Sequence, residues 1–320
     1  IRLSLVGSEM CIRDRVEFNQ TRPGDRRFLQ GFGGDTSNAV IAAARAGAQV
    51  AYLSRVGDDA FGQALLDLWH EEQVDVEGVE RDAAHPTGIY FVTHGEQGHA
   101  FSYLRAGSAA SHMTPQWLDG PVAQTIAQSR VLHVSGISLA ISATACDTVF
   151  AAMQLAREAG TLVSFDSNLR LKLWPLARAR ACITQAVSMC DVFLPSLEDV
   201  AALVGLHEPD AVIDWAHALG ASSVVLKLGS DGALISQRVG DEYRRERIPG
   251  HAVELVDATG AGDCFCGNLL ARLARGQPLA DAARYANAAA ALSVQGFGAV
   301  APLPRADAVI ARLRDTNDRS

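Results

Sequence analysis

Short apolar runs alternate with longer runs rich in alanine and leucine along most of the chain. The short runs are rich in Val, Leu and Ile, which is typical of buried strands, and the strand candidates are 50–53, 131–134, 162–166, 192–194 and 223–228. The longer runs carry apolar residues at helical spacing, and the helix candidates are 38–46, 62–72, 146–159 and 176–188. Strands that alternate with helices predict an α/β fold with a doubly wound, mostly parallel sheet flanked by helices.

One segment breaks this alternation. Residues 88–104 contain the runs GIYFVTH and HAFSYL around a GEQG turn, and they predict a β-hairpin. The run VEFNQ at 16–20 is a candidate strand of the same small sheet. We therefore expect a lid, with strands from about 16–32 and 86–106, beside the carboxyl edge of the main sheet, where open α/β sheets bind their ligands.

Composition and charge exclude several classes of protein. A chain of 320 residues with 48% hydrophobic residues is long enough for one large α/β domain. The net charge of −8 and the aromatic content of 6% argue against a surface that binds nucleic acid. No apolar stretch approaches the roughly 18 residues that would predict a membrane span. The six cysteines and nine histidines show no convincing metal-ligand spacing, and a reducing cytoplasm is the expected location.

The first fifteen residues have an unusual sequence. They read IRLSLVGSEMCIRDR, and EMCIRDR resembles the translated end of a sequencing-library transposon. We therefore expect 1–15 to be non-native, followed by a single domain over 16–312 and a polar tail over 313–320. The alternative is that LSLVG is a genuine first strand. If the segment is non-native, any site residue of the natural first strand is lost.

The run DATGAGD at 257–263 is a glycine-broken turn that ends in a carboxylate and enters an apolar helix. Gly260 and Gly262 allow successive N–H groups to point to one side, and a helix N-terminus adds partial positive charge. Asp263 does not suit a phosphate site unless it faces a hydroxyl whose proton it accepts. The sequence therefore predicts an anion cradle with a built-in base. An ordinary helix cap after a glycine turn is the alternative.

Two further clusters lie on either side of the predicted hairpin strands. GFGGDTSN at 31–38 is a glycine-rich helix start in which Asp35 or Asn38 could bind sugar hydroxyls, although a capped helix explains the same residues. In YLRAGSA at 103–109, alternation places Tyr103 and Arg105 on one face of a strand. Such an arginine suits a bidentate carboxylate contact, or it lies over the aromatic ring at the surface.

The last two clusters follow predicted strands of the main sheet. DSNLR at 166–170 places polar side chains at the carboxyl end of a strand, where α/β sites are built; a plain polar loop is the alternative. Lys227 precedes the turn that contains Gly229 and Gly232, and these residues could contact a nucleotide. An ordinary hairpin turn explains this last cluster equally well.

Taken in order, these clusters resemble the PfkB, or ribokinase-like, family of carbohydrate kinases. Two family signatures carry the resemblance, GGDTSNAVIAAARAG at 33–47 and DATGAGDCFCGNLLARL at 257–273. The family implies a doubly wound α/β core with a small β-sheet lid. It also implies that Asp263 is the base that activates a sugar hydroxyl, and that the amides of Gly260, Ala261 and Gly262 form the anion hole.

Within the family, YLRAGSA and DSNLR with Trp174 resemble the 2-keto-3-deoxygluconate kinases, whose sugar-acid substrate needs cations such as Arg105 and Arg170. This resemblance implies ATP-dependent formation of the 6-phosphate, with Mg²⁺, a monovalent cation as a further candidate, and a homo-oligomeric enzyme. It implies that the sugar contacts Gly34, Asn38, Tyr90, Tyr103, Arg105, Arg170 and Asp263. The nucleotide is then expected at Ser196, Lys227, Gly229, Gly232, Gly260, Gly262 and Asn287.

The chain departs from the family pattern at two places, and other functions stay open. Ala258 stands where the family usually has Thr, Pro or Ser, and the common NxxE motif appears as SLED, so its acidic role toward magnesium could move to Asp199. A kinase of a neutral sugar, of the fructokinase, ribokinase or 5-dehydro-2-deoxygluconokinase type, is the first alternative. A non-catalytic sugar sensor is another. A dinucleotide-dependent dehydrogenase is disfavoured, because no GxGxxG follows the first credible strand.

Overall fold

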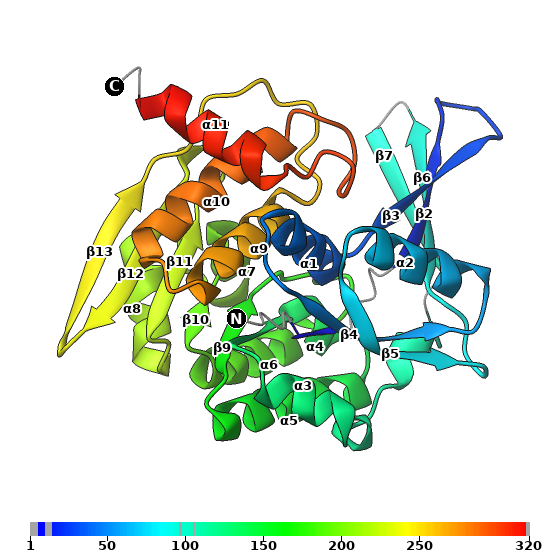
Figure 1. Ribbon diagram of the computed structural model, residues 1–320, viewed down its shortest axis with the longest axis horizontal. Helices are drawn as coiled ribbons and strands as arrows, with labels where there is room; N and C mark the ends of the chain where they lie inside the picture. The colour runs from blue at the N-terminus through cyan, green and yellow to red at the C-terminus, as the bar shows by residue number, and fades with distance from the viewer. Residues whose placement is uncertain (1–5, 10–14, 96–97, 105, 318–320) are drawn as a thin grey trace.

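The computed structural model describes residues 6–9, 15–95, 98–104 and 106–317. Within this part of the chain, two sheets and the helices around the larger sheet make up the fold (Figure 1). No helix of the described part combines the length and the apolarity needed to cross a lipid bilayer.

The main sheet has the strand order β13-β12-β11-β10-β9-β8-β1-β4-β5. Neighbouring strands pair in parallel, apart from β12, which pairs antiparallel with both β11 and β13. The strands are β1 (Val6–Glu9), β4 (Ala51–Gly57), β5 (Asp75–Asp82), β8 (Val131–Ser135), β9 (Leu162–Asp166), β10 (Val192–Phe193), β11 (Ser223–Lys227), β12 (Ala233–Val239) and β13 (Glu242–Ile248). The predicted mostly parallel sheet is confirmed.

Helices cover both faces of this sheet (Figure 1). One core contains α1 (Asp35–Arg45), α2 (Ala60–Glu71), α9 (Ala261–Ala274), α10 (Leu279–Ser293) and α11 (Ala306–Asn317). The other contains α3 (Pro121–Ala127), α4 (Gly136–Ala140), α5 (Ala143–Ala159), α6 (Leu176–Met189), α7 (Leu197–Val204) and α8 (Pro209–Leu219). Successive strand residues enter different cores, as Val131 and Leu132 do. Burial on both faces explains why the central strands are mostly apolar and lack a regular polar alternation.

The second sheet is the predicted lid, with strand order β3-β2-β6-β7. Its strands are β2 (Arg15–Gln20), β3 (Phe28–Gly33), β6 (Ile89–Gly95) and β7 (Gly98–Leu104), and β6 pairs antiparallel with β7 as the hairpin pattern predicts. One face is aromatic, with the rings of Phe18 and Phe91 stacked at 5.2 Å and Phe18 against Phe61 of α2. The lid sheet is therefore attached to the helical layer by aromatic contacts on one face.

The predicted strands and helices recur with small shifts at their ends, whereas several further elements, including β5 and the helices α3, α8, α10 and α11, have no counterpart among them. β5 (DVEGVERD) is rich in charged residues and lies at the edge of the sheet, so its pattern is polar. Gly78 accommodates it there, because a Cβ atom at this position would collide with the Leu53 side chain of β4.

The segment Val6–Glu9 forms β1, between β8 and β4 in the main sheet. Residues 1–5 and 10–14 lie outside the described residues. The hypothesis that 1–15 is non-native stays a prediction.

Candidate active site

A cavity of about 700 Å³ lies between the lid sheet and the segments that follow the main-sheet strands. Its wall combines residues of β2, β6 and β7, the start of α1, the loop after β9, the turn before α9 and the loop around 297–299. The sequence-predicted residues on this wall are Gly34, Asn38, Tyr90, Tyr103, Arg170, Gly260 and Asp263. Residues from both family signatures therefore meet at one cavity.

The turn before α9 has the geometry of a helix N-terminus opened by glycine. Gly260 caps the helix at a φ of +74°, and a Cβ atom there would press on Ala299 at 3.1 Å. Its carbonyl accepts the N–H of Cys264 at 2.8 Å, whereas the Ala261 N–H donates to Ala258 at 3.2 Å. Within the described residues no acceptor takes the N–H of Gly262. The helix start therefore retains a backbone donor for an anion.

Asp263 lies in the first turn of α9 and is held by Asn38 of α1. The Asn38 Nδ2 donates to Asp263 Oδ2 at 2.8 Å, and Asn38 Oδ1 accepts the Gly34 N–H at 3.3 Å. Asn38 is buried, and the contact joins positions 225 residues apart in the sequence. Asn38 therefore orients the carboxylate while the backbone at Gly34 orients Asn38.

Asp257 braces the turn that leads to the helix. Its Oδ1 accepts from the N–H and the hydroxyl of Thr259 at 2.9 and 2.7 Å. Its Oδ2 accepts the N–H of Gly298 at 2.9 Å. Asp257 thus ties the turn to the loop around 297–299, a role that the sequence analysis did not assign.

The lid and the loop after β9 contribute other parts of the cavity wall. The rings of Tyr90 and Tyr103 lie 6.0 Å apart on neighbouring strands. Arg170 donates from Nη1 to its neighbouring carbonyl at 2.8 Å and lines the cavity together with Lys172, which the sequence analysis missed. Arg105, the other predicted cation, lies outside the described residues.

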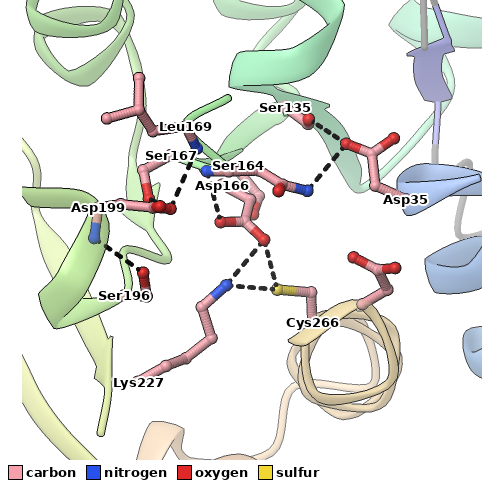
Figure 2. A network of polar contacts seen from close by, with 12 residues as sticks. Asp35, Ser135, Ser164, Asp166, Ser167, Leu169, Ser196, Asp199, Lys227 and Cys266 are labelled. Carbon is pink, nitrogen blue, oxygen red and sulfur yellow. Dashed lines mark hydrogen bonds and ion pairs between the residues drawn. The ribbon is translucent and has the colours of Figure 1, made fainter. Parts of the chain in front are cut away.

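A buried polar network lies beneath the site, and Figure 2 shows it. Lys227, the last residue of β11, places its Nζ 2.8 Å from Oδ2 of Asp166, the last residue of β9. The Cys266 thiol of α9 lies 3.3 Å from the same oxygen and 3.7 Å from Nζ. The network thus joins the ends of two strands to the helix that carries Asp263. Asp35, at the start of α1, also belongs to this group of polar residues, and its carboxylate accepts a hydrogen bond from the Ser135 hydroxyl.

Burial and neighbouring charges shift the pKa values of two residues in this network. Burial alone would lower the pKa of Lys227, but the adjacent Asp166 carboxylate raises that pKa above its ordinary value. Burial and the charge of Asp166 together raise the pKa of Asp199. The Asp199 carboxylate accepts the Ser167 hydroxyl at 2.9 Å and the Leu169 N–H at 3.1 Å (Figure 2). Asp199, the predicted acidic residue, therefore orders the strand end next to Asp166.

The remaining residues predicted to contact the nucleotide lie away from the wall of this cavity. Ser196 caps α7, its hydroxyl accepting the N–H of Asp199 at 3.2 Å. Gly232 has a φ of +92°, and a Cβ atom there would collide with the carbonyl of Ile248. Asn287 donates to that carbonyl at 3.3 Å. Gly229 lies in the same turn as Gly232, and the nucleotide role of these residues stays a prediction.

In the described part of the chain, no group of three or more His, Cys, Asp or Glu side chains is arranged to hold a metal ion. Mg²⁺ in nucleotide sites is usually held by one or two carboxylates together with phosphate oxygens and water, so such a site does not require a group of three.

Comparison with known families and proteins gives a consistent result. The family model described as pfkB family carbohydrate kinase matches residues 4–306. The chain is 34% identical over 305 residues to a 2-dehydro-3-deoxygluconokinase of Thermoproteus tenax, covering 91% of this chain and 89% of that protein. It is 33% identical to the enzyme of the same name from Bacillus subtilis, covering 87% and 85%. It is also 33% identical to fructokinase-1 of Oryza sativa subsp. japonica, covering 87% and 86%.

Solved structures share the fold over almost the whole chain. A PfkB protein from Polaromonas sp. JS666 superposes with a TM-score of 0.83 at 32% identity, covering 93% of this chain and 96% of that chain. A fructokinase double mutant from Vibrio cholerae O395, with fructose, ADP and a potassium ion, has a TM-score of 0.83 at 30% identity, with 98% of each chain covered. An E. coli protein in complex with ATP and Mg²⁺ has a TM-score of 0.82 at 26% identity, covering 94% and 96%.

Proposed function

The chain belongs to the PfkB family of carbohydrate kinases, and from this premise we propose that it phosphorylates 2-dehydro-3-deoxy-D-gluconate. The reaction transfers the γ-phosphoryl group of ATP to the terminal hydroxyl and gives the 6-phosphate. Relatives with this activity in their names match over most of the chain and support the proposal. The homo-oligomer that the sequence leads us to expect stays a prediction.

The contact between Asn38 and Asp263 carries the mechanistic proposal. Its 2.8 Å hydrogen bond fixes a carboxylate at the cavity wall, in the first turn of a helix whose N-terminus favours negative charge. Asp263 accepts the proton of the sugar hydroxyl as the oxygen attacks phosphorus, which is general base catalysis. Asn38 keeps the accepting oxygen aimed during this transfer, because it is itself buried and hydrogen-bonded.

The start of α9 fits a phosphate group. Gly262 offers an N–H with no acceptor in the described residues, and Gly260 lets the chain turn tightly before it. This Gly262 amide and the helix dipole hold developing negative charge on the transferred group. ATP would supply the phosphoryl group, and Mg²⁺ would supply positive charge beside its phosphates. The E. coli protein in complex with ATP and Mg²⁺ supports this pair. The potassium ion of the Vibrio fructokinase supports a monovalent cation.

A sugar acid is favoured over a neutral sugar by the cations on the wall. Arg170 and Lys172 both follow β9 and both line the cavity. A guanidinium binds a carboxylate through parallel hydrogen bonds, which a neutral sugar does not need. We expect Arg105 to add a third cation. Fructose is the second candidate substrate, because fructokinases match the chain at nearly the same identity.

An ADP-release assay with a panel of sugar acids and neutral sugars tests the substrate. We expect the highest kcat/KM for 2-dehydro-3-deoxy-D-gluconate, and a preference for fructose or ribose would refute the proposal. Asp263→Asn should lower kcat by roughly a hundredfold or more, since it removes the base while keeping the shape of the side chain. Asp241→Asn, in the exposed turn between β12 and β13, is the matched control and should retain full activity.

A further inference from the structure

The first residue of α1 carries a buried carboxylate. Asp35 is only 2% exposed, whereas Gly34 and Asn38 of the same helix start line the cavity. Its Oδ2 accepts a hydrogen bond from the hydroxyl of Ser135, the last residue of β8 (Figure 2). The same oxygen accepts a hydrogen bond from Asn168 Nδ2 at 3.0 Å. The sequence suggested Asp35 as a ligand of sugar hydroxyls, but its burial and these partners indicate a role behind the cavity wall.

Asn168 has a backbone conformation that its surroundings must hold. It lies two residues after β9 with a φ of +28°, a value that residues other than glycine rarely adopt. Its N–H donates to Asp166 Oδ1 at 3.2 Å, and its side chain donates to Asp35. The chain then continues into Arg170 and Lys172, which bring positive charge to the cavity wall. The contact with Asp35 therefore fixes the start of the loop that carries both cations.

Ser135 extends the same network to a second segment of the wall. Its hydroxyl donates to Asp35 and, as the N-cap of α4, accepts the N–H of Ile137 at 3.1 Å. Ile137 lines the cavity. One carboxylate thus joins the start of α1 to the ends of the neighbouring strands β8 and β9.

The same helix start also orients the base. Asn38, one turn after Asp35, donates to Asp263 at 2.8 Å. A sugar acid has to place its carboxylate at the cations and its terminal hydroxyl at Asp263 in one bound pose. A misplacement of about 1 Å can cost about a hundredfold in rate, so the distance between the cation loop and the base has to be held.

We propose that Asp35 is a positioning residue that keeps the loop after β9, and with it Arg170 and Lys172, in register with the base, so that the enzyme selects a sugar acid. This inference rests on the proposed function, since it takes a sugar acid as the substrate. Asp35 acts through its hydrogen bond to Asn168. Removal of either partner should therefore impair the same property, the preference for an acidic substrate.

The preference is measured as ADP release with two substrates. They are 2-dehydro-3-deoxy-D-gluconate and its neutral analogue, in which the carboxylate is reduced to a hydroxymethyl group. The enzymes are the wild type, Asp35→Ala, Asn168→Gly and the double variant; glycine tolerates the positive φ, so Asn168→Gly removes the hydrogen bond without adding backbone strain. Asp35→Ala should lower kcat/KM about a hundredfold for the sugar acid and about tenfold for the analogue, because the cations no longer meet the carboxylate.

Two further variants separate positioning from a general structural role. Asp35→Asn keeps one acceptor oxygen for Asn168, so it should restore the acid preference to within about threefold of the wild type. Asp67→Ala removes an exposed aspartate of α2 and is the matched control, which should change neither kcat/KM value. Urea unfolding reports the stability of each protein. A merely structural role predicts equal losses with both substrates, and that result would overturn the proposal.

The two changes should also be non-additive. Asn168→Gly should cost the wild type about tenfold in acid preference and the Asp35→Ala enzyme almost nothing, and additive losses would overturn the proposal. If Asp35→Ala does not fold, the same loss in Asn168→Gly and its absence in Asp35→Asn decide the question. If the wild type prefers a neutral sugar, the proposed function fails separately, and non-additivity in kcat/KM for that sugar decides whether Asp35 acts through Asn168. If no sugar is turned over, calorimetric sugar binding replaces kcat/KM in the same comparison.

Discussion

Removal of the Lys227 ammonium tests how the floor of the site is held together. Its partner Asp166 has a side chain that is only 5% exposed, so Lys227→Met leaves a carboxylate buried without its cation. At 2.8 Å the attraction between the two charges is about 6 kcal/mol for an effective dielectric constant of about 20. Desolvation offsets part of this attraction. We expect Lys227→Met to lower the free energy of unfolding by about 3–5 kcal/mol, the range for breaking a buried pair.

The double variant Asp166→Asn/Lys227→Met separates the lost pair from lost packing. It removes the orphaned charge, so it should regain at least about 2 kcal/mol relative to Lys227→Met. Arg247→Met is the matched control, because Arg247 and Asp231 form an ion pair at 3.7 Å with side chains 61% and 72% exposed. That control should stay within about 1 kcal/mol of the wild type.

Urea unfolding followed by circular dichroism and tryptophan fluorescence measures all four proteins. A loss below about 1 kcal/mol in Lys227→Met would refute the reasoning, and so would a double variant no more stable than the single one. Turnover gives a second readout. Because Cys266 of the network lies on α9, one turn after Asp263, a rearranged network should also lower kcat in Lys227→Met.

Further predictions concern the base, a buried histidine and a thiol pair. Asn38→Ala should lower kcat about tenfold to a hundredfold, because Asp263 loses the hydrogen bond that orients it. An ADP-release assay measures this loss, and a rate within about twofold of the wild type would contradict it. Burial lowers the pKa of His133 to about 4, so between about pH 7 and 4 the unfolded chain binds a proton that the folded chain does not. The free energy of unfolding should therefore fall by about 3 kcal/mol as the pH is lowered from about 7 to about 4. In urea titrations, His133→Gln should show a weaker dependence of this free energy on pH. The Sγ atoms of Cys146 and Cys182 lie 3.8 Å apart, so a mild oxidant such as diamide should join them, detectably by mass spectrometry and not in Cys182→Ser. Burial raises the pKa of Cys146 to about 12, so this reaction should be slow at pH 7 and faster at pH 9.

The pattern of the sequence predicts the layers of this fold well, because the central strands are buried on both faces. Their runs are therefore mostly apolar, with few polar residues such as His133 and Ser164, and are easy to recognise. The edge strand β5 escapes the same reasoning, since a charged strand such as DVEGVERD has no clear period. Its place beside β4 depends on Gly78 and on a register shift between Ala51 and Leu53, which only the packed structure reveals.

Local motifs predict the start of α9, because the glycines and the carboxylate of DATGAGD lie within seven residues. The partners of that turn are not local. Asn38 could be suggested from its own motif, but its contact with Asp263 spans 225 residues and follows from the packing of α1 on α9. Glu17 lies in a strand that the sequence predicts, yet its place on the cavity wall beside Tyr90 depends on the pairing of β2 with β6.

The buried network bears on the source of positive charge in phosphoryl transfer. Ser135, Asp166 and Lys227 each end a strand of the main sheet, so their gathering at one edge follows from parallel strands. The ion pair between Lys227 and Asp166 does not follow from the sequence, and it determines where the positive charge of Lys227 acts. The Lys227 ammonium is buried and bound to Asp166, so it neutralises a carboxylate beneath the site. We expect the charge that develops on the phosphoryl group to be met by the Gly262 amide at the start of α9 and by Mg²⁺ bound to the nucleotide, with the Lys227 ammonium close by, since its Nζ lies 3.7 Å from the place of a Cβ atom on Gly262. Substitutions in the turn 257–263 should therefore impair kcat more than they impair the binding of the sugar.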